Sequence, residues 1–420
     1  MKESIAILIT NFEGGGAQKV ALTHAQIFKK MGYDVHIIVI EHQESYSIPN
    51  DLNIHFLSSI QGKGSKFQKL LLSPTLPFRL AKYLKQHQIK LCISHLERAD
   101  FVNILAKFIN RHKSIGVIHS NLTSTYKTDN ISLSRIAYKW LVKILEPLHN
   151  QIVAVSQGIA TDLTQLGLPK NKIQVVLNPF DIKDIRAKAK EKLDIYGDIF
   201  DNDTIISIGR LSNQKGLWHS ILAFNQIKKS KPNLKYIILG DGPLREYHLN
   251  LSNNLGLKVY NIWDKNTIFS TNYDIYFLGF QANPFQFIAK SKMLVLSSHF
   301  EGLPNVLVES LIVGTPVIAT DVDSGPRELL SPDTNINYKT ENLEQAEYGI
   351  LIPIDNNQSP RFNSLQLSNS EKYIMEAMSL LLDNKDIRES YINRSEYRVI
   401  NFEINQIIPQ WEEILENFLN

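Results

Sequence analysis

Short apolar runs, separated by stretches of helical periodicity, dominate the first part of the chain. The runs are rich in Ile and Val and end at Gly, Ser, Thr or Asn, which is typical of buried strands. Because a helical pattern lies near each run, the order indicates a parallel α/β sheet covered by helices. We expect these strands within 4–10, 33–40, 89–95, 114–120, 151–156 and 172–181.

The same pattern starts again after a charged helical segment at 184–192. We expect the second set of strands within 203–208, 234–240, 273–280, 293–298 and 315–320. The repetition predicts two Rossmann-like domains with a cleft between them, one at 1–178 and one at 179–399. Residues 331–345 and 356–370 are polar and are expected to be loops. The end of the chain, about 400–420, predicts an amphipathic helix with Trp411, Ile414, Leu415 and Phe418 on one side.

The segment 293–321 contains a polar residue that packing alone does not explain. Two short apolar runs flank a loop and a nearly all-apolar helix at 305–313, which predicts a βαβ unit with a right-handed connection. Glu301 falls beyond the first of these strands, where ligands bind in such sheets. Glu309 has apolar neighbours all round its helix, so its carboxylate should be at least half buried and should need hydrogen-bond donors. Ribose hydroxyls would serve, and so would backbone N–H groups or an Arg; the pattern leaves both open.

Composition and charge add two constraints. Of 420 residues, 43% are apolar and 21% charged, as in ordinary soluble proteins, and one cysteine, Cys92, fits a reducing compartment and a place in the core. No window approaches the roughly 20 apolar residues of a membrane span, so we expect a cytoplasmic protein. Residues 1–178 carry a net charge of +10 and the remainder −7. The first half is therefore expected to face an anionic partner.

Two groups of residues suit the binding of phosphate. Arg210 and Lys215 follow an expected strand directly, and Arg can fork onto two phosphate oxygens while Lys acts as a point charge. Gly14, Gly15 and Gly16 follow the first expected strand, and small residues let a backbone approach a ligand closely. Three consecutive glycines are nevertheless not a dinucleotide fingerprint, and they are often only a turn.

Several motifs in order resemble glycosyltransferase family 4, whose members are retaining enzymes of the GT-B fold. They are GGGAQKV, VSQGIATDL and LNPFD in the first half, and SIGRLSNQKG, LGDGPLRE, HFEGLPNVLVESLIVGTPVIATD and SGPREL in the second. The final helix is similar to one that crosses back to the first domain in this fold. The SGPREL variant resembles bacterial capsule, lipopolysaccharide and lipid-linked glycan transferases, which favours a UDP-hexose or UDP-N-acetylhexosamine.

The resemblance implies a role for each candidate residue in the second half. Arg210 and Lys215 would bind the diphosphate and stabilise the leaving group, which is transition-state stabilisation. Glu301 would contact the transferred sugar and Glu309 the ribose. Backbone groups at the remaining positions would contact the phosphates or the base: Gly209, Gly240, Gly242, Phe280, Gly302 and Leu303.

In the first half, the resemblance points to one histidine and to the glycine loop. His119 ends an expected strand, and its family counterpart sits beside the reacting sugar carbon. His95, which ends the preceding strand, is a weaker candidate for the acceptor side. Gly15 and Gly16 would let the backbone approach the donor. The predicted catalytic residues are therefore His119, Arg210, Lys215 and Glu301, and no nucleophile or general base stands out.

No metal or other cofactor is expected. Asp321 and Asp323 match the D-x-D pattern of metal-dependent transferases, but two Asp residues at this spacing are common by chance. In the GT-B resemblance Arg and Lys replace the metal. Loss of activity in EDTA would contradict this expectation.

A basic stretch in the first half suggests a membrane surface. Between Lys63 and Lys113 there are eleven Lys and Arg against two acids. Arg79, Lys82 and Lys85 recur on an expected helix, a pattern that suits an anionic bilayer but equally a helix with its basic face in water. The apolar residues that could enter the interface are Phe67, Leu70, Leu71, Leu72, Pro77 and Phe78. The resemblance favours membrane contact, because many members glycosylate lipid-linked acceptors.

The sequence thus predicts a retaining glycosyltransferase that moves a hexose or N-acetylhexosamine from a UDP-sugar to a glycan or lipid-linked acceptor, in cell-surface polysaccharide synthesis. One alternative is a UDP-sugar 2-epimerase on the same architecture, which would turn over donor without acceptor. Another is a non-catalytic protein that binds a sugar nucleotide or nucleic acid. Nucleic acid is not expected, since no reading motif is present. The sugar, acceptor and linkage stay open.

Overall fold

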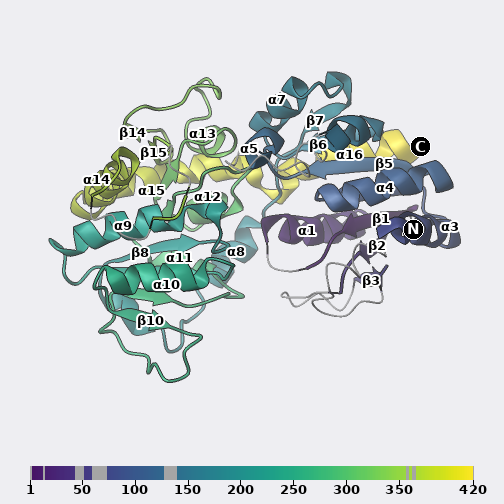
Figure 1. Ribbon diagram of the computed structural model, residues 1–420. Helices are drawn as coiled ribbons and strands as arrows, with labels where there is room; N and C mark the ends of the chain where they lie inside the picture. The colour runs from purple at the N-terminus through teal and green to yellow at the C-terminus, as the bar shows by residue number, and fades with distance from the viewer. Residues whose placement is uncertain are drawn as a thin grey trace. The chain divides into compact units, whose positions relative to one another are not determined.

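The computed structural model describes residues 2–12, 15–42, 52–58, 73–126, 140–355, 359–361 and 366–419 (Figure 1). The chain forms two compact units. The first consists of Met1–Pro179 and Ile404–Asn420, and the second of Phe180–Glu403. The final helix thus belongs to the first unit, although the whole second unit separates it from Pro179 in sequence.

The first unit is built on one parallel sheet of seven strands in the order β3-β2-β1-β4-β5-β6-β7. This is the doubly wound order, in which the chain changes direction between β1 and β4. The strands are β1 Ser4–Ile9, β2 Asp34–Val39, β3 Asn53–Phe56, β4 Leu91–His95, β5 Lys113–Ile118, β6 Gln151–Ala154 and β7 Ile173–Val175. The helices are α1 Gly16–Lys30, α3 Leu76–Gln86, α4 Glu97–Asn110, α5 Leu122–Tyr126, α7 Gln157–Gln165 and α16 Ile404–Leu419, with 3-10 turns η1 Ser73–Thr75, η2 Glu146–Leu148 and η3 Lys170–Lys172.

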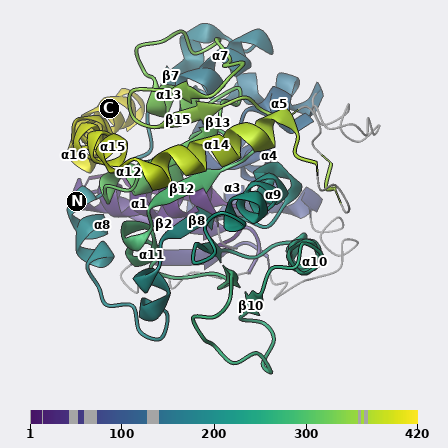
Figure 2. The same ribbon diagram turned by 90° about the vertical axis from the view of Figure 1, so that its left-hand side faces the viewer.

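The second unit has a sheet of eight strands in the order β10-β11-β9-β8-β12-β13-β15-β14, all parallel except β14. The strands are β8 Thr204–Ile208, β9 Lys235–Leu239, β10 Val259–Asn261, β11 Ile275–Phe277, β12 Met293–Leu296, β13 Val317–Thr320, β14 Glu344–Gln345 and β15 Ile350–Ile352. The helices are α8 Ile182–Ala189, α9 Leu217–Lys228, α10 Arg245–Asn254, α11 Phe285–Lys290, α12 Asn305–Ile312, α13 Pro326–Leu330, α14 Asn369–Asp383 and α15 Lys385–Val399, with 3-10 turns η4 Gly197–Asp201, η5 Asn213–Lys215 and η6 Ile400–Phe402. Figure 2 shows α14 lying across this sheet, where it contacts α9, β13 and β15.

The apolar side chains of the strands form the core of each unit, as their patterns predicted. Every residue of β9, β12 and β13 is buried, which explains their near-continuous apolar sequence. Cys92 is buried in β4, as expected. The amphipathic helix α16 buries Trp411 and Leu415 completely, and the Trp411 ring meets His24 and Phe28 of α1 edge to face. The first unit therefore needs α16 to complete its core.

Four strands were missed by the sequence analysis, β3, β10, β14 and β15. Each has only two to four residues, so its apolar pattern is too short to distinguish from a loop. β14 lies at the end of the segment 331–345 that was expected to be loop. These strands pair at or near the edges of their sheets, where neighbouring strands rather than local sequence decide the conformation.

Candidate functional site

The main polar site of the second unit lies where the order of its strands reverses. β8 pairs with β9 on one side and with β12 on the other, and ligands in such sheets bind outside the carboxyl ends of the strands at this point. A pocket opens there. Its lining includes Ser207, Gly209, Arg210, Lys215, Val295 and Ser297. The structure thus brings the two predicted phosphate-binding cations, Arg210 and Lys215, to one pocket.

Lys215 and Glu301 form an ion pair beside this pocket. Glu301 is 5% exposed, and its Oε1 accepts hydrogen bonds from Lys215 Nζ at 2.5 Å and from Ser298 Oγ at 2.6 Å. Ser324 Oγ donates to the backbone oxygen of Glu301 at 2.7 Å, which fixes the loop. The ammonium group of Lys215 therefore neutralises the buried carboxylate of Glu301. A bound phosphate would have to share this ammonium group with Glu301.

Tight backbone packing holds the loop that carries Lys215. Gly216, the next residue, has φ +52°, and a Cβ atom there would lie 2.4 Å from Ser297 O. Gly240 has φ +127°, and its Cβ would lie 2.0 Å from Gly209 O. Only glycine fits such positions, since any side chain would collide with backbone. The loops after β8, β9 and β12 are thus in direct contact, which accounts for the glycines without a ligand.

Glu309 is buried, as its apolar surroundings predicted. It lies on the second turn of α12 and is 6% exposed. Gly302 and Leu303 precede this helix, and the backbone of Gly302 is so close to Gly325 that a Cβ on Gly325 would lie 2.6 Å from Gly302 O. Phe280, three residues beyond β11, is 48% exposed. The contacts of these residues with a nucleotide sugar stay predictions.

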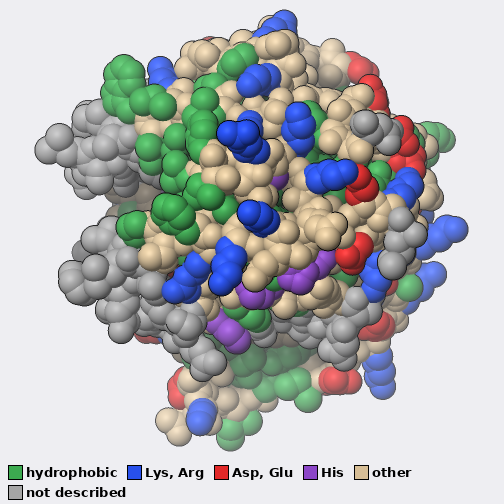
Figure 3. All heavy atoms as spheres, turned by 90° about the vertical axis from the view of Figure 1, so that its right-hand side faces the viewer, with side chains coloured by type: hydrophobic (Ala, Val, Ile, Leu, Met, Phe, Trp, Pro, Cys, Tyr) green, Lys and Arg blue, Asp and Glu red, His purple; other side chains and the backbone are tan. Residues whose placement is uncertain are grey.

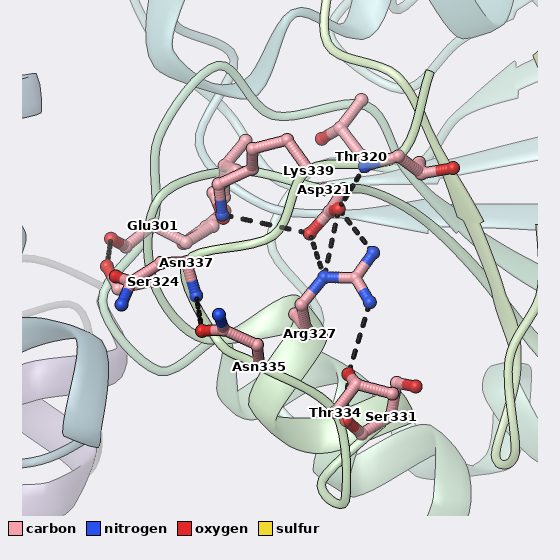
Figure 4. Close-up of polar contacts among 12 residues, drawn as sticks. Glu301, Thr320, Asp321, Ser324, Arg327, Ser331, Thr334, Asn335, Asn337 and Lys339 are labelled. Atoms are coloured by element: carbon pink, nitrogen blue, oxygen red, sulfur yellow. Dashed lines mark hydrogen bonds and ion pairs between the residues drawn. The ribbon is translucent and has the colours of Figure 1, made fainter. Parts of the chain in front are cut away.

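Asp321, the first acid of the D-x-D pattern, is enclosed by cations and N–H groups (Figure 4). It is 1% exposed, accepts from Arg327 Nη2 at 2.5 Å and from the backbone N–H of Thr340 at 2.8 Å, and lies 3.8 Å from Lys339 Nζ. Arg327 also donates to Glu344 at 2.7 Å. Although burial alone lowers the pKa of Arg327, its hydrogen bonds to Glu344 and Asp321 raise that pKa above the usual value. The carboxylate of Asp321 thus has a structural role that the sequence pattern did not reveal.

A second buried network, which the sequence analysis missed, lies behind the Lys215 loop. His219 Nδ1 contacts Glu371 Oε1 at 2.8 Å, and His219 Nε2 lies 3.1 Å from His299 Nε2. Arg361 also donates to Glu371, and the pKa of this carboxyl is lowered by His219 and Arg361 against the opposing effect of burial. Ligand atoms of His219, Asp355 and Glu371 lie within 4.8 Å of one another, which is compatible with a metal ion. Arg361 already pairs with Glu371, so this carboxylate has a cationic partner without a metal ion.

In the first unit, three histidines gather at the last residue of β4 (His95), directly after β5 (His119) and on α1 (His24). His119 Nε2 lies 2.9 Å from His95 Nδ1, and the His24 ring centroid is 5.3 Å from that of His95. Burial lowers the pKa of His119 to about 3, and burial together with the charge of His119 lowers that of His24 to about 3. The rings are therefore neutral at physiological pH. The structure thus brings His119 and His95, both named from sequence, into direct contact.

The comparisons with known proteins decide the family. Residues 14–184 match the family model described as Glycosyltransferase Family 4, and residues 189–361 match Glycosyl transferases group 1. An uncharacterized glycosyltransferase of Methanocaldococcus jannaschii is 32% identical over 81% of this chain and 82% of its own length.

The chain belongs to the glycosyltransferases. Another relative, from Campylobacter jejuni, is named N-acetylgalactosamine-N,N'-diacetylbacillosaminyl-diphospho-undecaprenol 4-alpha-N-acetylgalactosaminyltransferase; it is 27% identical over 96% of each chain. The crystal structure of Anabaena HepE in complex with UDP-glucose superposes with a TM-score of 0.73 over 99% of each chain at 18% identity. The GT-B fold expected from the sequence is thereby confirmed.

The basic segment of this glycosyltransferase differs in part from the expectation. Arg79, Lys82 and Lys85 lie exposed on α3, as the pattern predicted. Pro77, which the sequence pattern allowed to enter a membrane interface, is instead buried in the first turn of α3, because the helix packs its apolar side against the unit. Phe78 is 65% exposed. The other proposed interface residues, Phe67, Leu70, Leu71 and Leu72, lie outside the described residues, as does Gly14 of the glycine loop.

Gly15 and Gly16 of the glycosyltransferase lie at the start of α1, after the loop that follows β1. The strand order of the first sheet reverses between β1 and β4. Gly15 is the N-cap, and a Cβ there would meet Gln18 Oε1 at 2.5 Å.

Within the described part of the chain, no helix has both the length and the apolar character needed to cross a bilayer.

Proposed function

We propose that this glycosyltransferase moves a hexose or N-acetylhexosamine from a UDP-sugar to a lipid-linked glycan acceptor, with retention at the anomeric carbon. The observation that carries the proposal is the Lys215–Glu301 ion pair beside Arg210 at the strand reversal of the second unit. Cations at this position suit a diphosphate, and a buried carboxylate beside them suits sugar hydroxyls. The UDP-glucose complex of the HepE structure supports a UDP-sugar donor.

In this proposal the cations act on the leaving group. Arg210 and Lys215 hold the diphosphate, and Lys215 turns from Glu301 towards the phosphate oxygen that gains charge as the sugar leaves. Stabilising that charge lowers the transition state more than the ground state, which raises turnover. Glu301, released from Lys215, accepts hydrogen bonds from the transferred sugar. Glu309 holds the ribose, and His119 faces the reacting carbon.

Backbone groups complete the proposed donor site. Those that would contact phosphates or base are Gly15, Gly16, Gly209, Gly240, Gly242, Phe280, Gly302 and Leu303. Because glycine at Gly209, Gly240 and Gly242 brings the backbones of two loops together, their N–H and C=O groups can meet a nucleotide without intervening side chains.

The acceptor part of the proposal rests on the relatives. The Campylobacter jejuni relative is named for transfer to a saccharide on diphospho-undecaprenol. An acceptor of this kind is anchored in a membrane, so we propose action at the cytoplasmic face of the cell membrane, in the synthesis of a surface polysaccharide. Nucleic acid is not a proposed partner.

We further propose that transfer needs no metal ion, since Arg210 and Lys215 supply the positive charge that a metal would otherwise provide. Turnover should persist in about 5–10 mM EDTA, a concentration of chelator that exceeds any trace metal in the assay. Loss of turnover that Mg²⁺ or Mn²⁺ restores would contradict this, and would direct attention to His219, Asp355 and Glu371.

The deciding experiment is a panel of UDP-glucose, UDP-galactose, UDP-N-acetylglucosamine and UDP-N-acetylgalactosamine, scored for UDP release with and without extracted membrane lipid. We expect release from one donor that depends on the extract, and an axial linkage in the product by NMR. Release without acceptor, with appearance of a 2-epimer, would instead establish an epimerase.

Glu309→Ala tests the site in the same assay. Loss of the ribose contacts should raise the donor KM on the order of tenfold to a hundredfold, because a buried hydrogen-bonded charge contributes about 1.5–3 kcal/mol. Glu413→Ala, on the exposed side of α16, is the matched control. Unchanged donor use in Glu309→Ala would remove this residue from the site.

A further inference from the structure

Among the described residues of the first unit, the large exposed apolar side chains other than Phe78 lie on two neighbouring segments. Leu105, Phe108 and Ile109 lie on one face of α4, with Phe108 65% exposed. The second segment is helical at 140–145 and continues into η2; it exposes Trp140, Leu141, Ile144 and Leu148. Lys107 Nζ donates to Leu148 O at 2.7 Å, which joins the two segments. Exposed apolar patches on this scale mark interaction sites. We call these seven residues the apolar ridge.

The charged groups around the apolar ridge are basic. On 101–113 and 140–148 the exposed or half-exposed charges are Lys107, Arg111, Lys113 and Lys143, whereas the acid of these segments, Glu146, is fully buried. Lys172 Nζ donates to the carbonyls of Pro147 and His149, which adds another cation beside η2. Helix α3, which packs against α4, presents Arg79, Lys82 and Lys85 and contains no acid.

The space-filling view in Figure 3 shows the same separation of charge on one face of the molecule. Hydrophobic side chains gather along one border next to Lys and Arg, while Asp and Glu gather mainly towards the opposite border. An exposed apolar strip beside basic side chains is the pattern of a protein that lies on an anionic bilayer, with aromatic and aliphatic side chains at the headgroup level and cations at the lipid phosphates.

We propose that the apolar ridge and the surrounding cations form a docking surface for an anionic lipid bilayer. Charge complementarity selects this partner, because two copies of the chain meeting through the ridge would place Lys and Arg against Lys and Arg. The proposal deepens the proposed function by naming the surface that a membrane-anchored acceptor requires. It adds α4 and 140–148 to the apolar residues within 67–78 that the sequence pattern named as able to enter a membrane interface.

The test measures docking without donor or acceptor, so its result does not depend on the proposed transfer reaction. Full-length protein is sedimented with vesicles of phosphatidylcholine alone or with about 30% phosphatidylglycerol, in about 0.1 M and 0.5 M NaCl, concentrations at which the screening length differs strongly. We expect binding to the anionic vesicles at low salt, with a severalfold or greater loss at high salt or on neutral vesicles. Equal partition onto neutral vesicles would overturn the proposal.

Matched variants locate the surface. Phe108→Glu combined with Ile144→Glu should lower the partition coefficient about tenfold or more, because two apolar groups leave the interface and two negative charges are added. The control is Ile268→Glu combined with Ile400→Glu, which changes two exposed apolar residues of the second unit, 83% and 52% exposed, and should bind as the unmodified protein does. Equal loss in both double variants, or in neither, would contradict the assignment.

A fluorescence measurement covers the case in which a variant fails to fold. Trp140 is 63% exposed, whereas Trp218 and Trp411 are fully buried. Brominated lipids in anionic vesicles should quench emission of the unmodified protein and should quench Trp140→Phe markedly less. Equal quenching of both proteins would place the bilayer elsewhere. A concentration-dependent dimer that the Phe108→Glu, Ile144→Glu variant abolishes would show a second copy on the ridge, and would also overturn the proposal.

Discussion

The strand ends of the two units hold their polar side chains in different ways. In the second unit two pairs of opposite charge lie there: Lys215 with Glu301, and Arg327 with Asp321. In the first unit the corresponding region contains neutral histidines that contact one another, and His95 Nε2 and both ring nitrogens of His24 are buried with no hydrogen-bond partner among the described residues. The Lys215–Glu301 site therefore has fixed charge, whereas these histidines of the first unit are uncharged, although the Arg98–Glu41 ion pair lies in the same unit.

Because of this difference, we expect the two groups of side chains to respond differently to a change of pH and to the substitution of one residue. A buried ion pair tolerates a change of pH near neutrality but does not tolerate the loss of one partner, because the remaining charge is stranded. A buried neutral histidine tolerates substitution by another apolar ring but resists protonation. The Lys215–Glu301 site is thus suited to an anionic ligand, and the cluster of His24, His95 and His119 to an uncharged contact.

The largest effect should come from breaking the pair between Arg327 and Asp321. Arg327→Met leaves a carboxylate that is 1% exposed without its main partner, which should lower the free energy of unfolding by about 3–5 kcal/mol. Urea unfolding measures it. Adding Asp321→Asn should restore part of the loss, since the stranded charge is removed. A single variant within about 1 kcal/mol of the unmodified protein, a loss typical of a surface pair, would show that the pair is not structural.

Lys215→Ala should have the next largest effect, on turnover rather than on stability. Removing one group that stabilises charge in the transition state typically costs about 10²–10³ in kcat. Glu301 then loses its cation, so unfolding should be followed in parallel. Lys231→Ala, which removes a surface pair with Asp383, serves as the control. An unchanged kcat together with a lowered stability would show that Lys215 has only a structural role, as the partner of Glu301.

A smaller effect is expected on the pH dependence of stability. The pKa of His24 falls from 6.5 in the unfolded chain to about 3 in the folded protein, because of burial and then the charge of His119. The unfolded state therefore takes up a proton below pH 6.5 that the folded state does not, so stability is lost as pH falls from 6.5 towards 3, and above 6.5 this histidine contributes no pH dependence. The Phe ring of His24→Phe can still pack on Trp411 but takes up no proton. Between pH 7.5 and 5.5 this variant should therefore lose less stability than the unmodified protein, as measured by thermal unfolding.

The pH dependence of the unmodified protein must be compared with that of His24→Phe, because two buried acids make the folded state more stable as pH falls, opposite to the effect of His24. Burial, followed by the charge of Glu97, raises the pKa of Glu146 to about 8, and burial with Glu146 raises that of Asp100. Their contribution is present in both proteins and cancels in the difference. If both proteins lose equal stability, His24 is not the titrating group.

The smallest expected effect concerns the contact between His95 and His119. Because both rings are neutral, the nitrogen that His95 engages fixes which nitrogen of His119 carries the proton. His95→Leu should lower kcat roughly fivefold without changing the donor KM, since one hydrogen bond contributes about 1 kcal/mol. His95→Asn, whose amide can reach the same place, should recover most of the rate. A loss of stability with normal kcat in His95→Leu would mean that the contact is structural only.

The sequence predicted the parts of the fold and site that local pattern determines. Continuous apolar runs gave the central strands of both sheets, and the burial of Glu309 and Cys92 followed from their apolar neighbours. Pro77 was placed wrongly because charge periodicity showed which side of α3 is basic but not how much of its apolar side is covered. The role of Arg327 was missed because its partners, Asp321 and Glu344, lie on separate segments that only the folded sheet brings together.

The His219–Glu371 contact could not be predicted for the same reason, since 152 positions separate the two residues. The apolar ridge is a similar case. Its residues are ordinary members of amphipathic stretches in sequence, and only the accessible surface distinguishes them from the buried ones. The order of the motifs, in contrast, is a property of the sequence alone, and it indicates the family.

Helix α16 adds a consequence for biosynthesis. A ribosome releases the whole of 180–403 before it makes Trp411, the ring that closes the core around His24 and Phe28. The half of the protein that is translated first is therefore the last to be completed, and a nascent chain must keep that core open until its final helix has emerged.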